Sequence, residues 1–123
     1  MSDYLVLFVT GERGIVFDPA LHRFVTFDLP LGERIVDQLV YADVAVFVTP
    51  DRTVGYKSGG GNFRERSFSG GETFRQLKVL AAGLISVITS DRALLFQGPS
   101  ARWMEWTEGD LEGVGGVYSP SEY

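Results

Sequence analysis

Three runs of apolar residues follow one another along the chain at nearly constant spacing, and the same polar signature continues each of them. The runs cover residues 5–9, 44–48 and 84–88, and each leads into a Thr, two further residues and an Arg. A second, shorter stretch then ends in an aromatic side chain, which is Phe17, Tyr56 or Phe96. The copies are separated by 39 and 40 residues, a period typical of repeat architectures. The pattern therefore predicts three copies of one structural unit.

Within each copy, short apolar stretches separated by Gly, Pro and Asp predict four short strands. In the first copy these strands are expected at residues 4–9, 15–17, 23–28 and 35–41. The first is apolar at every position, so we expect it to be buried on both faces. The second copy repeats the order at 44–49, 54–56, 63–68 and 74–80, and the third at 84–89, 93–96 and 102–106. A glycine-rich stretch at 114–118 is the last candidate strand.

Two details of the repeat need interpretation. Residues 74–82 could form a helix, because Thr73 could cap its start and Gly83 could end it. The β-branched residues at the equivalent positions of the first copy favour a strand instead. In addition, one extra residue separates Glu72 from Thr89 relative to the first copy. We expect this insertion in the turn around residues 81–83, where it would leave both flanking strands in phase.

Composition limits the class of protein. With 123 residues, of which 45% are apolar, the chain is expected to form a single domain at 1–123, with repeats at about 3–41, 42–81 and 82–118. It has no Cys, which excludes disulfides and thiolate metal sites. A net charge of −5 argues against non-specific binding to nucleic acid or an anionic membrane. No apolar run reaches the roughly 18 residues of a membrane span, so we expect a soluble cytoplasmic protein.

The unit Val-Phe-Val-Thr-Pro-Asp-Arg at residues 46–52, continued to Tyr56, resembles the blade repeats of β-propellers of the chromosome-condensation-regulator-like and tachylectin-like kind. The resemblance covers residues 4–118 and implies an all-β fold of three four-stranded antiparallel blades. With blade strands lettered A to D from the ring centre outwards, it makes residues 35–41 an A strand and 44–49 a B strand. The chain then runs B-C-D, A-B-C-D, A-B-C-D and ends with one more A strand at 114–118.

Three blades cannot close a ring, because closed propellers usually need about 4 to 8 blades. Both end faces of a three-blade fragment would stay open, and Leu5, Val6, Leu7 and Phe8 would be among the apolar residues left there. We therefore expect a homodimer that forms one six-bladed propeller. In such a pair, residues 114–118 of each copy would complete the first blade of the other by strand exchange.

The repeat also places charged residues at equivalent points of a propeller. Arg13, Arg52 and Arg92 follow the first strand of each copy, and the loops that precede the next copy carry Glu33, Glu72 and Glu112. One interpretation is that each Arg pairs with a loop Glu or a turn carbonyl and joins adjacent strands. The other is a ring of guanidinium groups that binds an anionic ligand, since Arg offers a planar pair of donors to carboxylate or phosphate. These six residues form the candidate ligand-binding set.

No side chains point clearly to catalysis. His22 is the only His, so neither a catalytic triad nor a His-based metal site is predicted, and no cofactor is expected. Aromatic residues on the third strand of each copy could stack on a sugar or base, or could pack between blades: Phe24, Phe27, Phe63, Phe68, Trp103 and Trp106. The sequence favours a binding or interaction module for a protein segment, a sugar or a small anion. The alternatives are an enzyme with a channel acid such as Asp37, or a purely structural fragment of an assembly.

Overall fold

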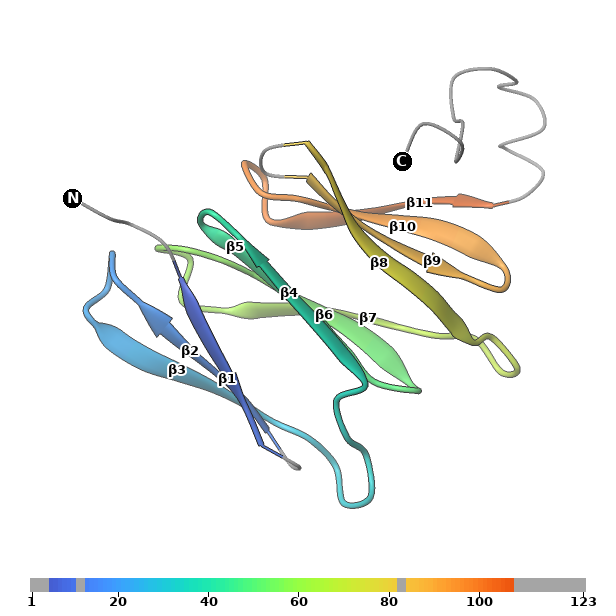
Figure 1. The fold of residues 1–123 in the computed structure, drawn as a ribbon, viewed down its shortest axis with the longest axis horizontal. Helices are drawn as coiled ribbons and strands as arrows, with labels where there is room; N and C mark the ends of the chain where they lie inside the picture. Colours follow the sequence, from blue (N-terminus) through green and yellow to red (C-terminus); the bar gives the residue numbers. More distant parts are fainter. Residues whose placement is uncertain (1–4, 11–12, 82–83, 108–123) are drawn as a thin grey trace.

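Each sequence copy forms a sheet of its own in the computed structural model, which describes residues 5–10, 13–81 and 84–107. Within these ranges the protein is all-β, with eleven strands in three antiparallel sheets and no helix. The sheets follow one another side by side, from the blue N-terminal sheet through the green one to the orange one (Figure 1). They do not close into a barrel in the part of the chain that is described.

Strands that are consecutive in the sequence are neighbours in the sheets. The first sheet contains β1 (Val6–Val9), β2 (Arg13–Asp18) and β3 (Arg23–Asp28). The second contains β4 (Asp37–Tyr41), β5 (Val44–Val48), β6 (Arg52–Lys57) and β7 (Phe63–Ser67). The third contains β8 (Phe74–Ala81), β9 (Leu84–Thr89), β10 (Arg92–Gln97) and β11 (Arg102–Thr107). The predicted order of the eleven strands is confirmed, whereas the candidate strand at 114–118 lies outside the described residues.

The turn before the last strand of each sheet uses the same backbone conformation. His22, Gly61 and Ala101 occupy equivalent positions and have φ angles of 56°, 78° and 53°. This left-handed region is uncommon for residues other than Gly, so its recurrence in three hairpins shows that the repeat extends to backbone geometry. The single His is therefore a turn residue.

The core lies between the sheets. Val44, Val46 and Val48 of β5 pack with residues of β9 and β10, including Val87 and Phe96. All five residues of β5 are buried, because the strand has a sheet on each side. The expectation that residues 4–9 are buried on both faces is wrong for β1. Leu5 is buried against the second sheet, but Val6 and Phe8 are 44% and 50% exposed, since no described residue covers the outer face of the first sheet.

Aromatic rings pack closely against two glycines of the neighbouring sheets. A Cβ atom at Gly55 would lie 2.7 Å from the ring of Phe96, and one at Gly14 would lie 2.7 Å from the ring of Phe47. Real Cβ atoms do not approach ring carbons this closely, so a side chain at either position would push the sheets apart. The two glycines therefore set the distance between adjacent sheets.

The stretch at 74–80 is a strand, and the helical alternative is wrong. The expected position of the extra residue is also corrected. Ala81 pairs with Leu84 as Tyr41 pairs with Val44, so the two connections have the same length. The irregularities fall within β8, between Phe74 and Gln76 and between Val79 and Ala81. A bulge absorbs an inserted residue inside a strand while the partner strand stays regular, and β9 is indeed continuous.

Candidate functional site

Four residues of the candidate ligand-binding set come together where one sheet is connected to the next: Glu33 with Arg52, and Glu72 with Arg92. Glu33 lies in the loop between β3 and β4, and Glu72 lies in the loop between β7 and β8. Tight turns orient both, since their backbone N–H groups donate to the carbonyls of Pro30 and Ser69, each at 3.0 Å. The Thr and Arg that receive each carboxylate belong to the turn between the second and third strands of the following sheet.

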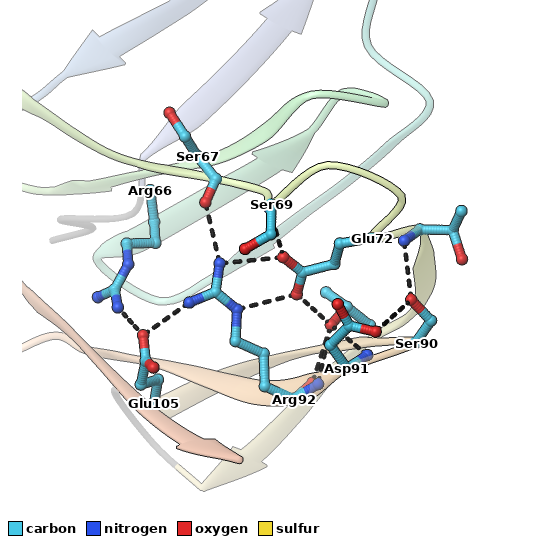
Figure 2. A network of polar contacts seen from close by, with 10 residues as sticks. Arg66, Ser67, Ser69, Glu72, Ser90, Asp91, Arg92 and Glu105 are labelled. Carbon is cyan, nitrogen blue, oxygen red and sulfur yellow. Dashed lines mark hydrogen bonds and ion pairs between the residues drawn. The ribbon is translucent and has the colours of Figure 1, made fainter. Parts of the chain in front are cut away.

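In the third sheet, Arg92 is held between two carboxylates (Figure 2). Its Nε donates to Oε2 of Glu72 at 2.9 Å and its Nη2 donates to Oε1 at 3.0 Å, which makes a two-pronged ion pair. Its Nη1 donates to Glu105 at 2.7 Å, and Arg66 contacts the same Glu105 oxygen. The side chain of Glu72 is 0% exposed and that of Arg92 is 12% exposed, so this pair is shielded from water.

The second sheet repeats the three hydrogen bonds between the arginine and the two carboxylates. Arg52 donates from Nε and Nη2 to Glu33 at 2.8 and 3.1 Å, and from Nη1 to Glu65 at 2.7 Å. The predicted pairing of these arginines with loop glutamates is therefore observed in two copies. Glu65 and Glu105 as second acceptors were not predicted, although they occupy equivalent positions on β7 and β11.

A threonine completes each unit. The hydroxyl of Thr49 accepts the backbone N–H groups of Asp51 and Arg52, both at 3.1 Å, and donates to Glu33 at 2.5 Å. Thr89 donates to Glu72 at the same distance and accepts the corresponding N–H groups of its own turn. The hydroxyl has one proton and two acceptor positions, and this geometry uses all three. We call each set of Glu, Thr and Arg a junction unit.

The hydrogen bonds decide the ionisation state of Glu72. Burial alone would raise the pKa of this carboxyl, but Arg92, Thr89 and the N–H of Ser69 all donate to it. Their combined effect outweighs burial and leaves the pKa of Glu72 below its ordinary value. The carboxylate therefore stays charged at neutral pH, as an acceptor without a proton to give, and this suits structural pairing rather than acid catalysis.

The first copy differs from the other two. Arg13 lies at the corresponding turn, and its Nε pairs with Asp28 at 3.2 Å; the two side chains are 49% and 73% exposed. Glu112 lies outside the described residues.

The structure thus joins Glu33 with Arg52 and Glu72 with Arg92. Because these guanidinium groups already donate to carboxylates, an anionic ligand would have to compete with them, and the ligand-binding assignment stays a prediction.

A third buried carboxylate, Asp18, was missed by sequence reasoning. Asp18 is fully buried at the end of β2 and accepts hydrogen bonds from the hydroxyl of Tyr56 at 2.5 Å and the N–H of Gly59 at 2.8 Å. Ser58 and the N–H of Ala20 also donate to it, at 3.1 and 2.9 Å. Burial would raise the pKa of Asp18, but these donors lower it overall, while burial and the Asp18 hydrogen bond raise the pKa of Tyr56. The contact joins the first and second sheets.

The aromatic residues mostly pack between sheets. Phe63 lies 5.4 Å from Phe27 and 4.9 Å from Tyr56, measured between ring centroids. Trp103 lies 5.0 Å from Phe96, and its Nε1 donates to the carbonyl of Arg64 at 2.8 Å. Sugar or base stacking by these two rings would require them to leave the junction between sheets. Phe24 is the exception, because 61% of it is exposed.

The chain matches no known family model, no curated protein and no solved structure. Among the residues described, no group of three or more His, Asp or Glu side chains is placed to hold a metal ion. The same part of the chain contains no helix long and apolar enough to cross a membrane. The function must therefore be argued from the geometry of the sheets.

Proposed function

We propose that the chain is an interaction module that works as a homodimer, in which two copies form one six-bladed β-propeller. The observation that supports this most directly is the open apolar face of the first sheet. In the second and third sheets, the residues at the equivalent positions pack against the preceding sheet. The outer face of the first sheet carries similar residues at each of these positions.

The outer face of the first sheet is defined by five side chains: Val6, Phe8, Ile15, Phe17 and Phe24. Their equivalents in the second sheet are Ala45, Phe47, Val54, Tyr56 and Phe63, and in the third sheet Ile85, Val87, Leu94, Phe96 and Trp103. These equivalents are buried or partly buried in the junctions between sheets. The repeat thus predicts that the outer face also packs against a sheet.

The distances between aromatic rings on the outer face are close to those between the equivalent rings that a sheet covers. Phe17 and Phe24 have ring centroids 5.2 Å apart, and the covered pair Phe96 and Trp103 has 5.0 Å. Phe8 and Phe24 are 6.3 Å apart, close to the 6.2 Å between the equivalent rings of the second sheet. The outer face is therefore already arranged as a packing surface, and an exposed cluster of this kind is typical of a protein interface.

The third sheet, at the other end of the stack, carries residues that fit this face. The first sheet packs on the second through Leu5, Val16 and Val25. The third sheet has apolar residues at the positions equivalent to these three and to Val9: Leu84, Leu95, Met104 and Ile88. The third sheet of a second copy can therefore pack on the outer face in the way that consecutive sheets pack within one chain. Two such contacts, related by a twofold axis, give six sheets, a number at which propellers close.

Strand exchange is the second part of the proposal. β5 and β9 each pair with a preceding strand, whereas β1 pairs with β2 alone among the described strands. An unpaired strand edge presents free N–H and C=O groups that another strand can satisfy. We place residues 114–118 of the second copy at this edge, as the counterpart of β4 and β8. A chain that ends at Glu112 should then dimerise more weakly, and unchanged affinity would contradict the exchange while leaving the sheet packing in place.

The packing of the outer face is tested by a pair of variants compared by sedimentation velocity. Phe24→Asp puts a charge on the outer face without touching the buried core, so the dimer should dissociate while the circular dichroism spectrum stays that of a β protein. Leu31→Asp is the matched control, because Leu31 is fully exposed in the loop between β3 and β4 and is not one of the five side chains of the outer face. Equal self-association of the two variants would overturn the proposal.

A further inference from the structure

We propose that an acidic peptide segment in an extended conformation binds in a groove between the second and third sheets. The groove has a volume of about 430 Å³, with β7 on one side and the start of β11 on the other. Arg64 and Arg66 of β7 line it together with Arg102 of β11, and we call it the arginine groove. The site goes beyond the proposed dimer, because both of its walls belong to one chain.

The arginine groove is a positively charged place on an acidic chain. The whole chain has a net charge of −5, whereas the groove is lined by three arginines and a single acidic residue, Glu65. The carboxylate of Glu65 already accepts a hydrogen bond from Arg52 at 2.7 Å, so its charge is largely compensated there. Complementary charge selects partners and speeds their association. The groove therefore favours a partner that carries carboxylates.

Two of the three arginines have donors to offer. Arg64 and Arg102 are exposed, and within the described residues neither guanidinium has an ion pair or a hydrogen bond. A guanidinium presents its N–H donors in one plane, which suits the two oxygens of a carboxylate. Arg52 and Arg92 differ, because carboxylates of the chain already occupy them. A ligand carboxylate would displace no acceptor of the described chain from Arg64 or Arg102.

The repeat shows that packing does not require arginines here. Arg64 and Arg66 occupy the positions that Val25 and Phe27 have in the first sheet. There the ring centroid of Phe27 lies 5.4 Å from that of Phe63, so apolar side chains fill the junction between the first and second sheets. Burial between sheets would favour apolar residues at both positions of the second sheet as well. An acidic ligand explains why Arg64 is charged instead.

The spacing of the arginines indicates an extended ligand. Arg64 and Arg66 are two residues apart on one strand, so their side chains share a face and lie roughly 7 Å apart. Alternate residues of an extended peptide have the same spacing. Arg66 already contacts the carboxylate of Glu105 on the third sheet, which shows that a carboxylate from another strand reaches this row (Figure 2).

The walls of the groove offer further contacts to a peptide. Among the described strands, β7 pairs with β6 alone and β11 with β10 alone, so both present an unpaired edge to a peptide backbone. Phe63 and Trp103 also line the groove, and Nε1 of Trp103 donates to the carbonyl of Arg64 at 2.8 Å, which fixes the indole ring. We place one carboxylate of the peptide between Arg64 and Arg102, and a second, two residues along, beside Arg66.

The test is a titration of the full chain into a fluorescently labelled peptide of six residues, followed by fluorescence anisotropy. The peptide consists of Thr with two Glu residues separated by one Thr. Arg64→Gln and Arg102→Gln should each raise its dissociation constant about tenfold, because each removes charge-assisted hydrogen bonds to a carboxylate.

Arg75→Gln is the matched control for these two variants. Arg75 is an exposed arginine of β8 that does not line the groove, so its replacement removes the same charge elsewhere. It should leave the dissociation constant within about twofold. Equal effects of Arg64→Gln and Arg75→Gln would refute the site, and so would a wild-type chain that does not bind the peptide.

Two further measurements test the nature of the ligand. A peptide with the two Glu residues adjacent should bind more weakly, because adjacent side chains of an extended chain point to opposite faces. Equal affinity for the two peptides would contradict the extended binding mode. Inorganic phosphate should displace the peptide no better than chloride does at equal ionic strength, and stronger displacement by phosphate would show a site for small anions instead of a peptide.

The groove and the proposed dimer can fail separately. Arg64→Gln leaves the outer face of the first sheet intact, so sedimentation equilibrium should give this variant the dimer dissociation constant of the wild type. A monomeric chain that binds the peptide would contradict the dimer alone. A dimer that does not bind the peptide would contradict the groove alone.

Discussion

The buried carboxylate of Glu72 gives the sharpest prediction about the fold. Glu72→Gln keeps the size of the side chain but removes its charge, and it leaves the guanidinium of Arg92 only the carboxylate of Glu105 as a charged acceptor. Removing one member of a buried ion pair typically costs about 3 to 5 kcal/mol. The Gln carbonyl can still accept one of the hydrogen bonds, so we expect a loss of about 3 kcal/mol, the lower end of that range. This is a large part of the roughly 5 to 15 kcal/mol that stabilises a domain of ordinary size.

The assay is urea unfolding, followed by tryptophan fluorescence at one fixed protein concentration. With a slope of about 2 kcal/mol per molar urea, the midpoint should fall by roughly 1.5 M. Glu65→Gln is the matched control, because Glu65 accepts a hydrogen bond of 2.7 Å from Arg52 but is half exposed. It should cost less than about 1 kcal/mol. Equal midpoints for the two variants would refute the argument that burial of the carboxylate makes the junction unit strong.

The pH dependence of the same comparison checks the cause. The pKa of Glu72 is lowered in the folded protein from its ordinary value of 4.5, so the carboxylate stabilises the fold fully above that value. Below 4.5 the unfolded chain takes up the proton first, and the contribution declines until the folded pKa is passed. The difference in stability between wild type and Glu72→Gln should therefore be constant near neutral pH and shrink as the pH falls below 4.5. A difference that grows on acidification would contradict this sign.

Three further predictions concern packing, the buried tyrosine and anion binding. Gly55→Ala should lower the free energy of unfolding by about 1 to 3 kcal/mol, because its Cβ would press on the ring of Phe96. Gly70→Ala should be nearly neutral, since nothing lies within 4 Å of a Cβ at that position, and urea midpoints check both variants. Tyr56→Phe removes a hydrogen-bond donor from the buried carboxylate of Asp18 and should lower the free energy of unfolding by about 1 to 3 kcal/mol. Tyr41→Phe, at an exposed position, should change the urea midpoint little. Inorganic phosphate should not raise the thermal unfolding midpoint more than chloride does at equal ionic strength, because carboxylates already occupy the donors of Arg52 and Arg92. A saturable increase with phosphate would instead favour the ligand-binding interpretation.

Much of the fold could be predicted because the repeat supplies the same information three times. Apolar runs and the Thr-x-x-Arg signature mark equivalent strands. The pairing of Arg52 with Glu33 and of Arg92 with Glu72 follows from the recurrence of Glu and Arg at equivalent positions of the repeat. The position of the inserted residue could not be predicted in the same way. A turn and a strand both accommodate an extra residue, and only the pairing of β8 with β9 shows that the bulges lie inside the strand.

The contact between Asp18 and Tyr56 was not predictable from the repeat because it occurs once. The positions equivalent to Asp18 are Lys57 and Gln97, so no spacing pattern indicates a buried carboxylate there. The open end face of the stack was expected from the blade count, and Val6 and Phe8 are indeed exposed there, whereas Leu5 is buried against the second sheet. The residues of β1 have the apolar character of the covered strand β5. The same similarity is what supports a second copy as the missing neighbour.

Small-angle X-ray scattering over a dilution series tests the proposed ring most directly, because it reports the mass and the dimensions of the assembly together. A closed pair should have twice the chain mass of 13.6 kDa and a radius of gyration of roughly 18 Å, as for a compact particle of that size, and neither value should change on dilution above the dissociation constant. A mass of 13.6 kDa at every concentration would contradict the dimer. A mass and radius that keep rising with concentration would contradict closure, since open head-to-tail contacts add copies without limit.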